Sequence, residues 1–338
     1  MCGSDSFLYQ DLHNRHPKMA ELKSIMTKMP LEVCCVTALP EFGVRWSEVS
    51  KAIRNARLPM TSASVARIIC RHVARSLEAD EVEDIVARLR LKLAATQPRT
   101  WHVIKMSERV TEEPVSLLTR CLPSRVRQAL NTVRRNMRPE IQTVLLGDLM
   151  YISVQLVSEV KEGTVLYVAT PPGQDIALVS SLAMNTLIRA CVQGLGFKEF
   201  TNANLYGRDI SSLLRISDEA WNENVEHLHQ VPNYEPTPVI TKNGIDYTHK
   251  TYDEKYVENL LGPNPPLLTD LKIETTKTFF DETKLSKPIN LRIQLKSEDV
   301  AKSLKTWVAK GALAPTSDFF QIFHKIKSNK ISFVQDSD

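Results

Sequence analysis

Apolar residues between positions 18 and 96 recur every three or four residues, which is the spacing of amphipathic helices. The pattern predicts helices over residues 19–29, 46–56, 62–79 and 80–96, and Pro30 ends the first of them. We therefore expect this part of the chain to fold as a small helical domain.

The predicted helix over residues 62–79 carries two separate stripes of side chains. One stripe is apolar and recurs every four residues: Val65, Ile69, Val73 and Leu77. The other is basic, has the same spacing and is displaced by two residues: Arg67, Arg71 and Arg75. A displacement of two residues is about 200° around a helix, so the arginines are expected to face away from the core.

The period changes after residue 97, where strands and helices follow one another. Strands are predicted over residues 101–106, 151–157, 164–169, 176–179 and 198–205. Helices are predicted over 114–136, 184–195 and 209–216, and Asp209 is expected to cap the last. This alternation indicates an α/β or α+β domain.

Residues 217–269 are acidic and contain six prolines, which predicts an extended connection with at most one helix, near residues 252–261. Strict alternation returns beyond it, where every second residue is apolar: Ile289, Leu291, Ile293 and Leu295. Strands are expected there, over 271–278 and over 330–334, and Ser297 is expected to cap a helix that contains Trp307 and ends at Gly311. Such a thin sheet has little core of its own, so we expect one face to pack on a partner.

The predicted fold class is α+β, in five segments. They are a disordered N-terminus (1–17), a helical domain (18–96), an α/β domain (97–217), an acidic, proline-rich connection (218–269) and a C-terminal domain of sheet and helix (270–338).

The net charge of +4 is distributed unevenly. Residues 1–150 sum to +7 and residues 151–338 to −3. Residues 51–77 hold six basic side chains and no acid, residues 114–139 hold six arginines and no acid, and residues 216–281 hold twelve acids against five lysines. This division indicates that the N-terminal half meets a polyanion.

Composition excludes several classes of protein. The hydrophobic content of 43% and charged content of 24% are typical of a globular protein. No apolar run is long enough for a transmembrane helix, and the N-terminus lacks the order of a secretory signal, so we expect neither a membrane anchor nor export. The six cysteines form no C-x-x-C pair and are expected to be free, mostly buried thiols.

No motif indicates catalysis, a metal or a cofactor. The eleven glycines include no phosphate-binding loop, and the sequence has no G-x-S-x-G and no H-E-x-x-H. His227 and His229 have no third ligand nearby. We therefore expect a non-enzymatic protein without cofactor or metal.

The arginine stripes allow two interpretations. Several arginines on one surface are suited to phosphates, because each neutralised phosphate releases a counterion and the guanidinium makes forked contacts. Alternatively, the stripes are solvated faces or meet acidic protein, including residues 216–281, and the chain is a scaffold that binds a protein partner without DNA. The sequence has no basic strands rich in aromatic residues and no zinc-finger spacing. Recognition of the DNA backbone and of DNA shape is therefore favoured over recognition of the bases.

Several stretches resemble centromere protein N (CENP-N) of the inner kinetochore. The resemblance is most specific in GPNPPLLTDLKIETTKTFF (262–280) and PINLRIQLKSEDVAKSLKTWVAKGALAPTSDFF (288–320). It continues in TLIRACVQGLGFKEFTNANLYGRDISSLLRI (186–216) and in the shorter segments IMTKMPLE (25–32) and TWHVIKMS (100–107). The shared order of these segments covers nearly the whole chain at low identity.

The resemblance implies a pyrin-like helical domain, a central α/β domain shared with the sister protein CENP-L, and a C-terminal segment that dimerises with CENP-L. It also implies a basic groove on nucleosomal DNA. Lys28 and Lys23 match basic positions of the first helix, and Arg208 matches a groove arginine. Together with the basic stretches, the expected DNA contacts are Lys23, Lys28, Arg54, Arg57, Arg67, Arg71, Arg189 and Arg208.

The chain departs from the family at several of its positions. Tyr206 stands where the family has an arginine, and Ala183 and Met184 stand where it has an arginine pair, for which Arg189 is the substitute. Lys18 and Leu22 align with the acidic residues that contact the centromeric histone variant, and Glu21 is the neighbouring candidate for that contact.

Together these features lead us to expect a nuclear adaptor of the constitutive centromere-associated network, located at the centromere and kinetochore. It would bind centromeric DNA, heterodimerise with a CENP-L-like protein and meet other inner-kinetochore subunits in chromosome segregation. The expected partner-binding residues are Ile289, Leu291, Ile293, Leu295 and Trp307.

Overall fold

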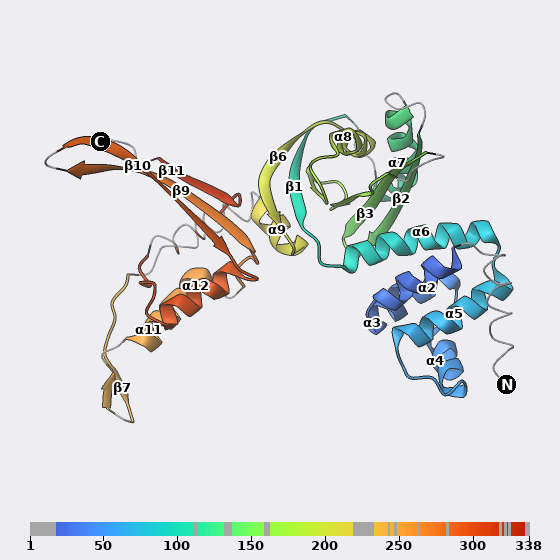
Figure 1. Ribbon diagram of the computed structural model, residues 1–338, viewed down its shortest axis with the longest axis horizontal. Coiled ribbons are helices and arrows are strands. Elements are labelled where there is room, and N and C mark those ends of the chain that lie inside the picture. Colours follow the sequence, from blue (N-terminus) through green and yellow to red (C-terminus); the bar gives the residue numbers. More distant parts are fainter. Residues whose placement is uncertain are drawn as a thin grey trace. The chain divides into compact units, whose positions relative to one another are not determined.

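The computed structural model is of mixed α+β type, with a six-stranded, a three-stranded and a two-stranded sheet among its described residues (Figure 1). The α+β class predicted from the sequence is confirmed. No described helix is both long enough and apolar enough to cross a membrane. The described residues are 18–110, 114–131, 137–158, 163–218, 233–242, 244–246, 249–262, 264–281, 284–317, 320, 323 and 326–334.

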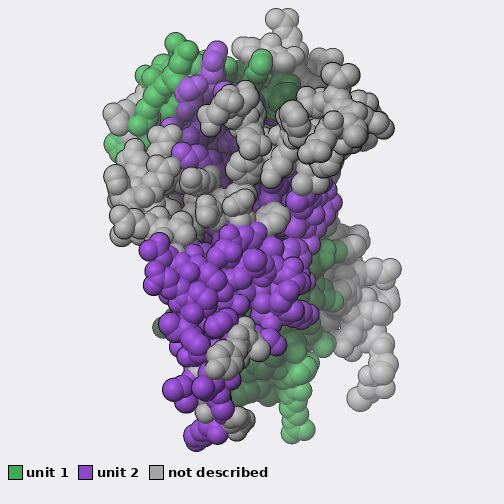
Figure 2. Space-filling view, turned by 90° about the vertical axis from the view of Figure 1, so that its left-hand side faces the viewer, with its two compact units in different colours: residues 1–98, 108–174, 183–198 green, residues 99–107, 175–182, 199–338 purple. Residues whose placement is uncertain are grey.

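Packing divides the chain into two compact units, which Figure 2 colours separately. Unit 1 comprises residues 1–98, 108–174 and 183–198, and unit 2 comprises residues 99–107, 175–182 and 199–338. The domain limits expected from the sequence stay a prediction.

Helical elements make up most of the described residues of unit 1 before residue 98. They are α2 (Met19–Lys28), α3 (Leu31–Val33), the π-helical turn η1 (Cys34–Ala38), the 3₁₀ turn η2 (Leu39–Phe42), α4 (Trp46–Asn55), α5 (Ser62–Ser76) and α6 (Ala79–Thr96). The four helices predicted from periodicity are present, whereas periodicity does not predict the helical turns over residues 31–42. Hydroxyl and carboxylate caps begin two of the helices: Thr61 Oγ1 accepts from the Ser64 amide before α5, and Glu78 and Glu81 form a capping box on α6.

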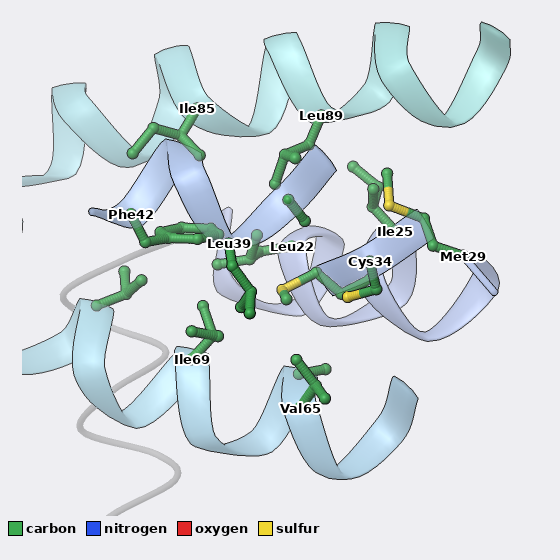
Figure 3. Close-up of a cluster of buried hydrophobic side chains, with 14 of the residues drawn as sticks. Leu22, Ile25, Met29, Cys34, Leu39, Phe42, Val65, Ile69, Ile85 and Leu89 are labelled. Carbon is green, nitrogen blue, oxygen red and sulfur yellow. The ribbon is translucent and has the colours of Figure 1, made fainter. Parts of the chain in front are cut away.

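The core of these helices lies where α2 packs between α5 and α6 (Figure 3). Leu22 and Met26 of α2, Ile69 of α5 and Leu89 of α6 are 0% exposed. These residues lie at helical spacing on their own elements, so a single apolar cluster accounts for the packing.

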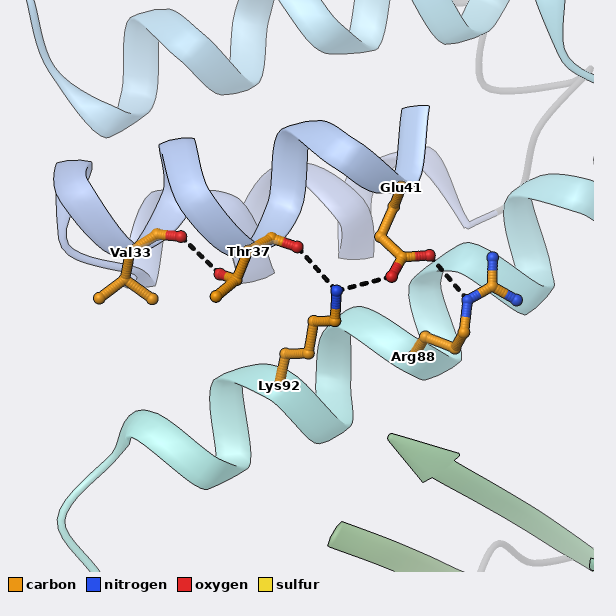
Figure 4. Close-up of polar contacts among 5 residues, drawn as sticks. All are labelled: Val33, Thr37, Glu41, Arg88 and Lys92. Atoms are coloured by element: carbon orange, nitrogen blue, oxygen red, sulfur yellow. Dashed lines mark hydrogen bonds and ion pairs between the residues drawn. The ribbon is translucent and has the colours of Figure 1, made fainter. Parts of the chain in front are cut away.

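A buried ion pair ties α6 to the turns that precede α4 (Figure 4). Lys92 Nζ donates to the Glu41 carboxylate at 2.6 Å and to the Thr37 carbonyl at 2.8 Å, and Arg88 Nε donates to the other Glu41 oxygen at 2.8 Å. Lys92 is 8% exposed, so its charge is almost fully removed from water. A charge in such a place needs a counter-charge and hydrogen bonds, and Glu41 and Thr37 supply both.

The six-stranded sheet has the order β2-β3-β4-β5-β1-β6. Its strands are β1 (Trp101–Arg109), β2 (Arg138–Leu146), β3 (Leu149–Val157), β4 (Leu166–Thr170), β5 (Ile176–Val179) and β6 (Phe197–Gly207). The pairs β2–β3, β3–β4 and β1–β5 are antiparallel, so the central region is organised as α+β and not as a parallel α/β sheet. The sequence pattern does not predict strand β2, and Arg138 is the first residue of this strand.

Helices α7 (Val115–Asn131), α8 (Asn185–Gly194) and α9 (Ile210–Ser217) accompany this sheet. α8 approaches α7 closely at Gly194, where a Cβ atom would lie 2.5 Å from Cγ2 of Val126, so only glycine fits there. Asp209 caps α9 as predicted, because its carboxylate accepts from the Ser212 amide at 2.8 Å.

The C-terminal part of unit 2 contains the other two sheets. They are built from β7 (Val239–Thr241) with β8 (Gly244–Asp246), and from β9 (Asp270–Asp281), β10 (Lys284–Lys296) and β11 (Lys330–Val334) in the order β10-β9-β11. β9 pairs with β10 in antiparallel and with β11 in parallel orientation. Helices α11 (Lys250–Leu261) and α12 (Val300–Ala309) pack on each other.

Two expectations for this region need correction. Among the described residues of the segment 218–269 are the β7–β8 hairpin and helix α11, so the segment is not simply extended. The residue that caps α12 is Asp299, whose carboxylate accepts from the Lys302 amide at 3.1 Å, whereas Ser297 donates to the Asp299 carbonyl. Asp299 lies directly before the helix, which is the position that a cap requires.

We expect Glu41→Gln to lower the free energy of unfolding by about 3 kcal/mol, because it leaves the buried Lys92 ammonium without a counter-charge. Urea unfolding followed by circular dichroism measures this loss. Glu48→Gln is the matched control, because its partner Arg45 has a side chain that is 83% exposed and an exposed pair contributes little. Equal losses in the two variants would contradict the role of the buried pair.

The same ion pair predicts a dependence of stability on pH. Burial raises the pKa of Glu41, but the hydrogen bonds and charges of Lys92 and Arg88 lower it by more, so the net pKa lies below its ordinary value of 4.5. The unfolded chain therefore binds the proton first, and stability is lost as the pH falls from 4.5 through the lowered pKa. We expect the urea midpoints of the wild type and Glu41→Gln to converge over this range, and a constant gap would contradict the linkage.

Candidate nucleic-acid interface

The basic stripe of α5 is exposed on the side opposite to the core. Arg67, Arg71 and Arg75 are all exposed, while Val65, Ile69 and Val73 on the other side of the helix are 0% exposed. The separation predicted from the sequence is therefore confirmed within α5, whereas Leu77, expected in the buried stripe, lies after the end of the helix and is half-buried. The cause of the separation is the helical repeat, which carries the two stripes to opposite faces.

The arginines of this stripe are available for an external anion. None of Arg67, Arg71 and Arg75 forms an ion pair with a described residue, and α5 itself contains no acid. Residues four apart on a helix are separated by about 6 Å along its axis, so the stripe extends for about 12 Å. It offers a short row of cations rather than a single charged point.

Lys23 is exposed on α2, which packs against α5. Burial raises the pKa of the Cys70 thiol of α5 to about 11, and the Lys23 charge acts against that rise. Arg67 precedes Cys70 by three residues and so lies on the same part of the helix surface. Lys28 is also exposed, in the last turn of α2, whose C-terminal carbonyl at Met29 accepts from Ser62 at the start of α5 at 2.8 Å.

Arg54 and Arg57 are both exposed at the end of α4, and they differ in their local structure. Arg54 folds back on its own helix, where Nε donates to the Ser50 carbonyl at 3.3 Å. Arg57 has a positive φ of 52°, and the Leu58 amide after it donates to the Ile53 carbonyl at 3.1 Å. This is the left-handed position that follows a helix, and glycine usually occupies it.

The remaining predicted cations lie on the central elements. Arg189 is exposed on α8 in unit 1, and Arg208 is exposed in unit 2, between β6 and α9. Arg208 therefore belongs to a different unit from Lys28 and Arg54. A common groove formed by these three residues stays a prediction.

The second acid-free stretch contributes exposed arginines as well. Arg120 and Arg127 are exposed on α7, and Arg138 is exposed at the start of β2. Arg134 and Arg135 lie outside the described residues.

The expected histone contact, Glu21, is engaged within the helical domain. Arg90 donates to its carboxylate through Nε at 2.9 Å and also through Nη2, and Lys18 Nζ lies 3.4 Å from the other oxygen. No sequence pattern indicates this pairing, because Glu21 and Arg90 are 69 residues apart. Any contact of Glu21 with a partner would compete with these ion pairs.

The predicted partner surface lies on β10 and α12. Ile293 and Leu295 are half-buried opposite Ile273 and Leu271 of β9, and β10 is at one edge of its sheet. The side chains of Ile289 and Leu291 lie outside the described residues. Trp307 on α12 is 39% exposed, which is unusual for so large an apolar side chain.

The described residues contain no group of three side chains that could hold a metal ion. All described cysteines are free, and burial raises the pKa of Cys34 and of Cys191 to about 12, so neither is a thiolate at neutral pH. A shallow cavity of about 340 Å³ lies at the start of α8, and none of its lining residues carries an ionisable side chain. His227, His229 and Cys2 lie outside the described residues.

The comparisons with known proteins give no match: no family model fits the sequence, and no curated protein matches it.

Two features of these surfaces could not be identified from the sequence. One is the conformation of Arg57, for which the only signal is Pro59, since proline is common shortly after a helix ends. The other is the division of the cations into paired and unpaired ones. Arg88, Arg90 and Lys92 of α6 are used within the fold, and no spacing rule distinguishes them from the arginines of α5.

We expect Arg57→Gly to raise the free energy of unfolding by about 1 kcal/mol, because glycine adopts the left-handed conformation without the penalty of a Cβ atom. Arg57→Ala keeps that penalty and is the control. Urea midpoints of the two variants measure the difference, and equal midpoints would contradict the strained conformation of Arg57.

Proposed function

We propose that this protein is a non-enzymatic chromosomal adaptor, which binds DNA through the basic face of its helical domain and a protein partner through its C-terminal sheet. The proposed binding of DNA is based on one observation, the row of arginines on α5. Three exposed arginines follow one another at helical spacing, on a helix without acids and without ion pairs to described residues. A surface of this kind is suited to a regular array of phosphates.

The resemblance to CENP-N supports the cellular setting of the proposal. In this view the helical domain is pyrin-like, the central region is the part shared with CENP-L, and the C-terminal region dimerises with a CENP-L-like protein. The chain is then a nuclear component of the inner kinetochore that acts in kinetochore assembly and chromosome segregation.

The proposed binding is electrostatic and independent of base sequence. Arginine is suited to it, because its planar guanidinium makes forked contacts with phosphate oxygens. Lys23 and Lys28 of α2, and Arg57 after α4, are further exposed cations of the same helical domain. Neutralising about six phosphates would give a slope near −5 in a plot of log affinity against log salt concentration. Curved duplex, as in a nucleosome, is recognised through its backbone and deformability in the same way.

The proposed binding of a protein partner is based on the edge strand β10 and on Trp307. An edge strand presents unpaired backbone groups that a second chain can extend, and an exposed tryptophan is a common anchor at interfaces. Both features lie in the C-terminal region, away in sequence from the α5 arginines.

We expect the double variant Arg67→Ala/Arg71→Ala to bind a labelled 30-base-pair duplex more weakly, whatever the base sequence. Its salt slope should be flatter by about 0.9 for each phosphate that the variant no longer neutralises. Fluorescence anisotropy of the full chain over a salt series measures both quantities.

Arg45→Ala is the matched control for this experiment, because Arg45 is exposed on the same domain but is paired with Glu48. A polyglutamate peptide serves as competitor. An unchanged slope in the double variant would contradict the proposed role of the stripe. Binding of polyglutamate with no binding of duplex would favour a scaffold that meets acidic protein.

A further inference from the structure

A buried asparagine joins β6 to the C-terminal sheet. Asn329 directly precedes β11 and is 1% exposed. On one side its amide N–H donates to the Asn204 carbonyl at 3.0 Å, and its side-chain Oδ1 accepts from the Tyr206 amide at 2.6 Å. On the other side Nδ2 donates to the Asp270 carbonyl at 2.5 Å, and its own carbonyl accepts from the Lys272 amide at 2.7 Å.

The side chain of Asn329 thus acts as a second peptide group. Asn204 and Tyr206 present a carbonyl and an amide to it from β6, and Asp270 and Lys272 present another such pair from β9. A single residue has one backbone donor and one backbone acceptor, which is too few for four partners. The carboxamide oxygen accepts the third hydrogen bond and an N–H of its amino group donates the fourth, so all four groups are paired.

The four hydrogen bonds of Asn329 form a connection between β6 and β9, which we call the Asn329 joint. Side chains on both sides of Asn329 strengthen this joint. The Tyr206 hydroxyl donates to the Asp270 carboxylate at 3.0 Å, and Gln294 of β10 donates to the same carboxylate at 3.0 Å. The His102 ring of β1 packs against the Tyr206 ring, with centroids 5.7 Å apart. Tyr206, which replaces an arginine expected from the resemblance, therefore has a role inside the fold.

Arg208 lies two residues after Tyr206, so the joint fixes the backbone on its N-terminal side. The backbone on its C-terminal side is held as well. Gly207 lies against Leu213, because a Cβ there would be 3.3 Å from Cδ2 of that leucine, and Asp209 caps α9. The Ser212 hydroxyl of α9 accepts from the Leu267 amide at 2.9 Å, which ties α9 to the segment before β9. The backbone around Arg208 is thus fixed from both directions, while its side chain is exposed and forms no ion pair with a described residue.

We infer that Asn329 is a positioning residue for Arg208, and that the C-terminal sheet holds this arginine in place for a phosphate through the Asn329 amide. The inference rests on the proposed binding of DNA, and on Arg208 being one of the DNA contacts that the resemblance to CENP-N implies. An arginine on a fixed backbone loses less conformational freedom on binding than one on a mobile loop, so the joint raises affinity without touching the ligand.

A double-mutant cycle on the full chain tests this role. Anisotropy with the 30-base-pair duplex over a salt series is measured for the wild type, Arg208→Ala, Asn329→Ala and the double variant. We expect each single variant to flatten the salt slope by about 0.9, the value for one neutralised phosphate. In Asn329→Ala we expect affinity to fall about fivefold, at the low end of measured couplings between sites. The double variant should bind as Arg208→Ala does, because Asn329 acts only through Arg208.

Two variants separate positioning from a general loss of structure. Tyr234→Phe is the control, because it removes a half-buried hydroxyl that donates to the Asp253 carboxylate elsewhere in unit 2, and it should leave the slope unchanged. Tyr206→Phe removes only the hydroxyl that binds Asp270. Tyr206→Phe should lower affinity less than Asn329→Ala does, and it should have no effect when Arg208 is already alanine. If Asn329→Ala does not fold, Tyr206→Phe takes its place in the cycle.

The outcomes distinguish this inference from the function on which it rests. If Arg208→Ala flattens the slope but Asn329→Ala and Tyr206→Phe do not, DNA binding stands and the positioning role is overturned. Equal losses from Asn329→Ala with and without Arg208 also overturn it, because they show a structural effect. If Arg208→Ala has no effect while the α5 variants weaken binding, Arg208 does not bind DNA and the inference fails alone. If neither has an effect, the proposed binding of DNA fails as well.

Discussion

The shared apolar cluster of α2, α5 and α6 is the constraint on which the rest of the helical domain depends. α5 can bury Val65, Ile69 and Val73 only in one orientation, and that orientation turns its arginines to the solvent. The direction of the basic stripe therefore needs no interaction of its own. It follows from the burial of apolar side chains, which is the stronger of the two effects.

Electrostatics then divides the cations of this domain into two groups. Glu41 and Glu21 bind Lys92, Arg88 and Arg90 of α6, so these charges serve the fold. The arginines of α5 face no acid of their own helix and form no ion pair with a described residue. A uniform count of basic residues would treat both groups alike, and only the packing of α6 against α2 and against the turns before α4 tells them apart.

Periodicity is sufficient to predict α2, α4, α5 and α6, most strands after residue 100, and the exposure of the α5 arginines, because each depends on local spacing. Periodicity fails where local spacing does not determine the structure. The turns over residues 31–42 change from α to π to 3₁₀ geometry, so no single period describes them. In β2 the buried residues are Pro139, Ile141 and Val144, so the strand period of two is broken after Ile141. The ion pairs that join Glu21 and Glu41 to α6 span 47 to 69 positions, and no sequence pattern indicates them.

The joint at Asn329 has a mechanical consequence. Its four hydrogen bonds meet at one buried residue, so opening one leaves a polar group of Asn329 unsatisfied and favours opening of the rest. A connection of this kind is brittle rather than elastic. The end of β6 and the start of β9 would then move together as one body up to a threshold load and separate in a single step beyond it.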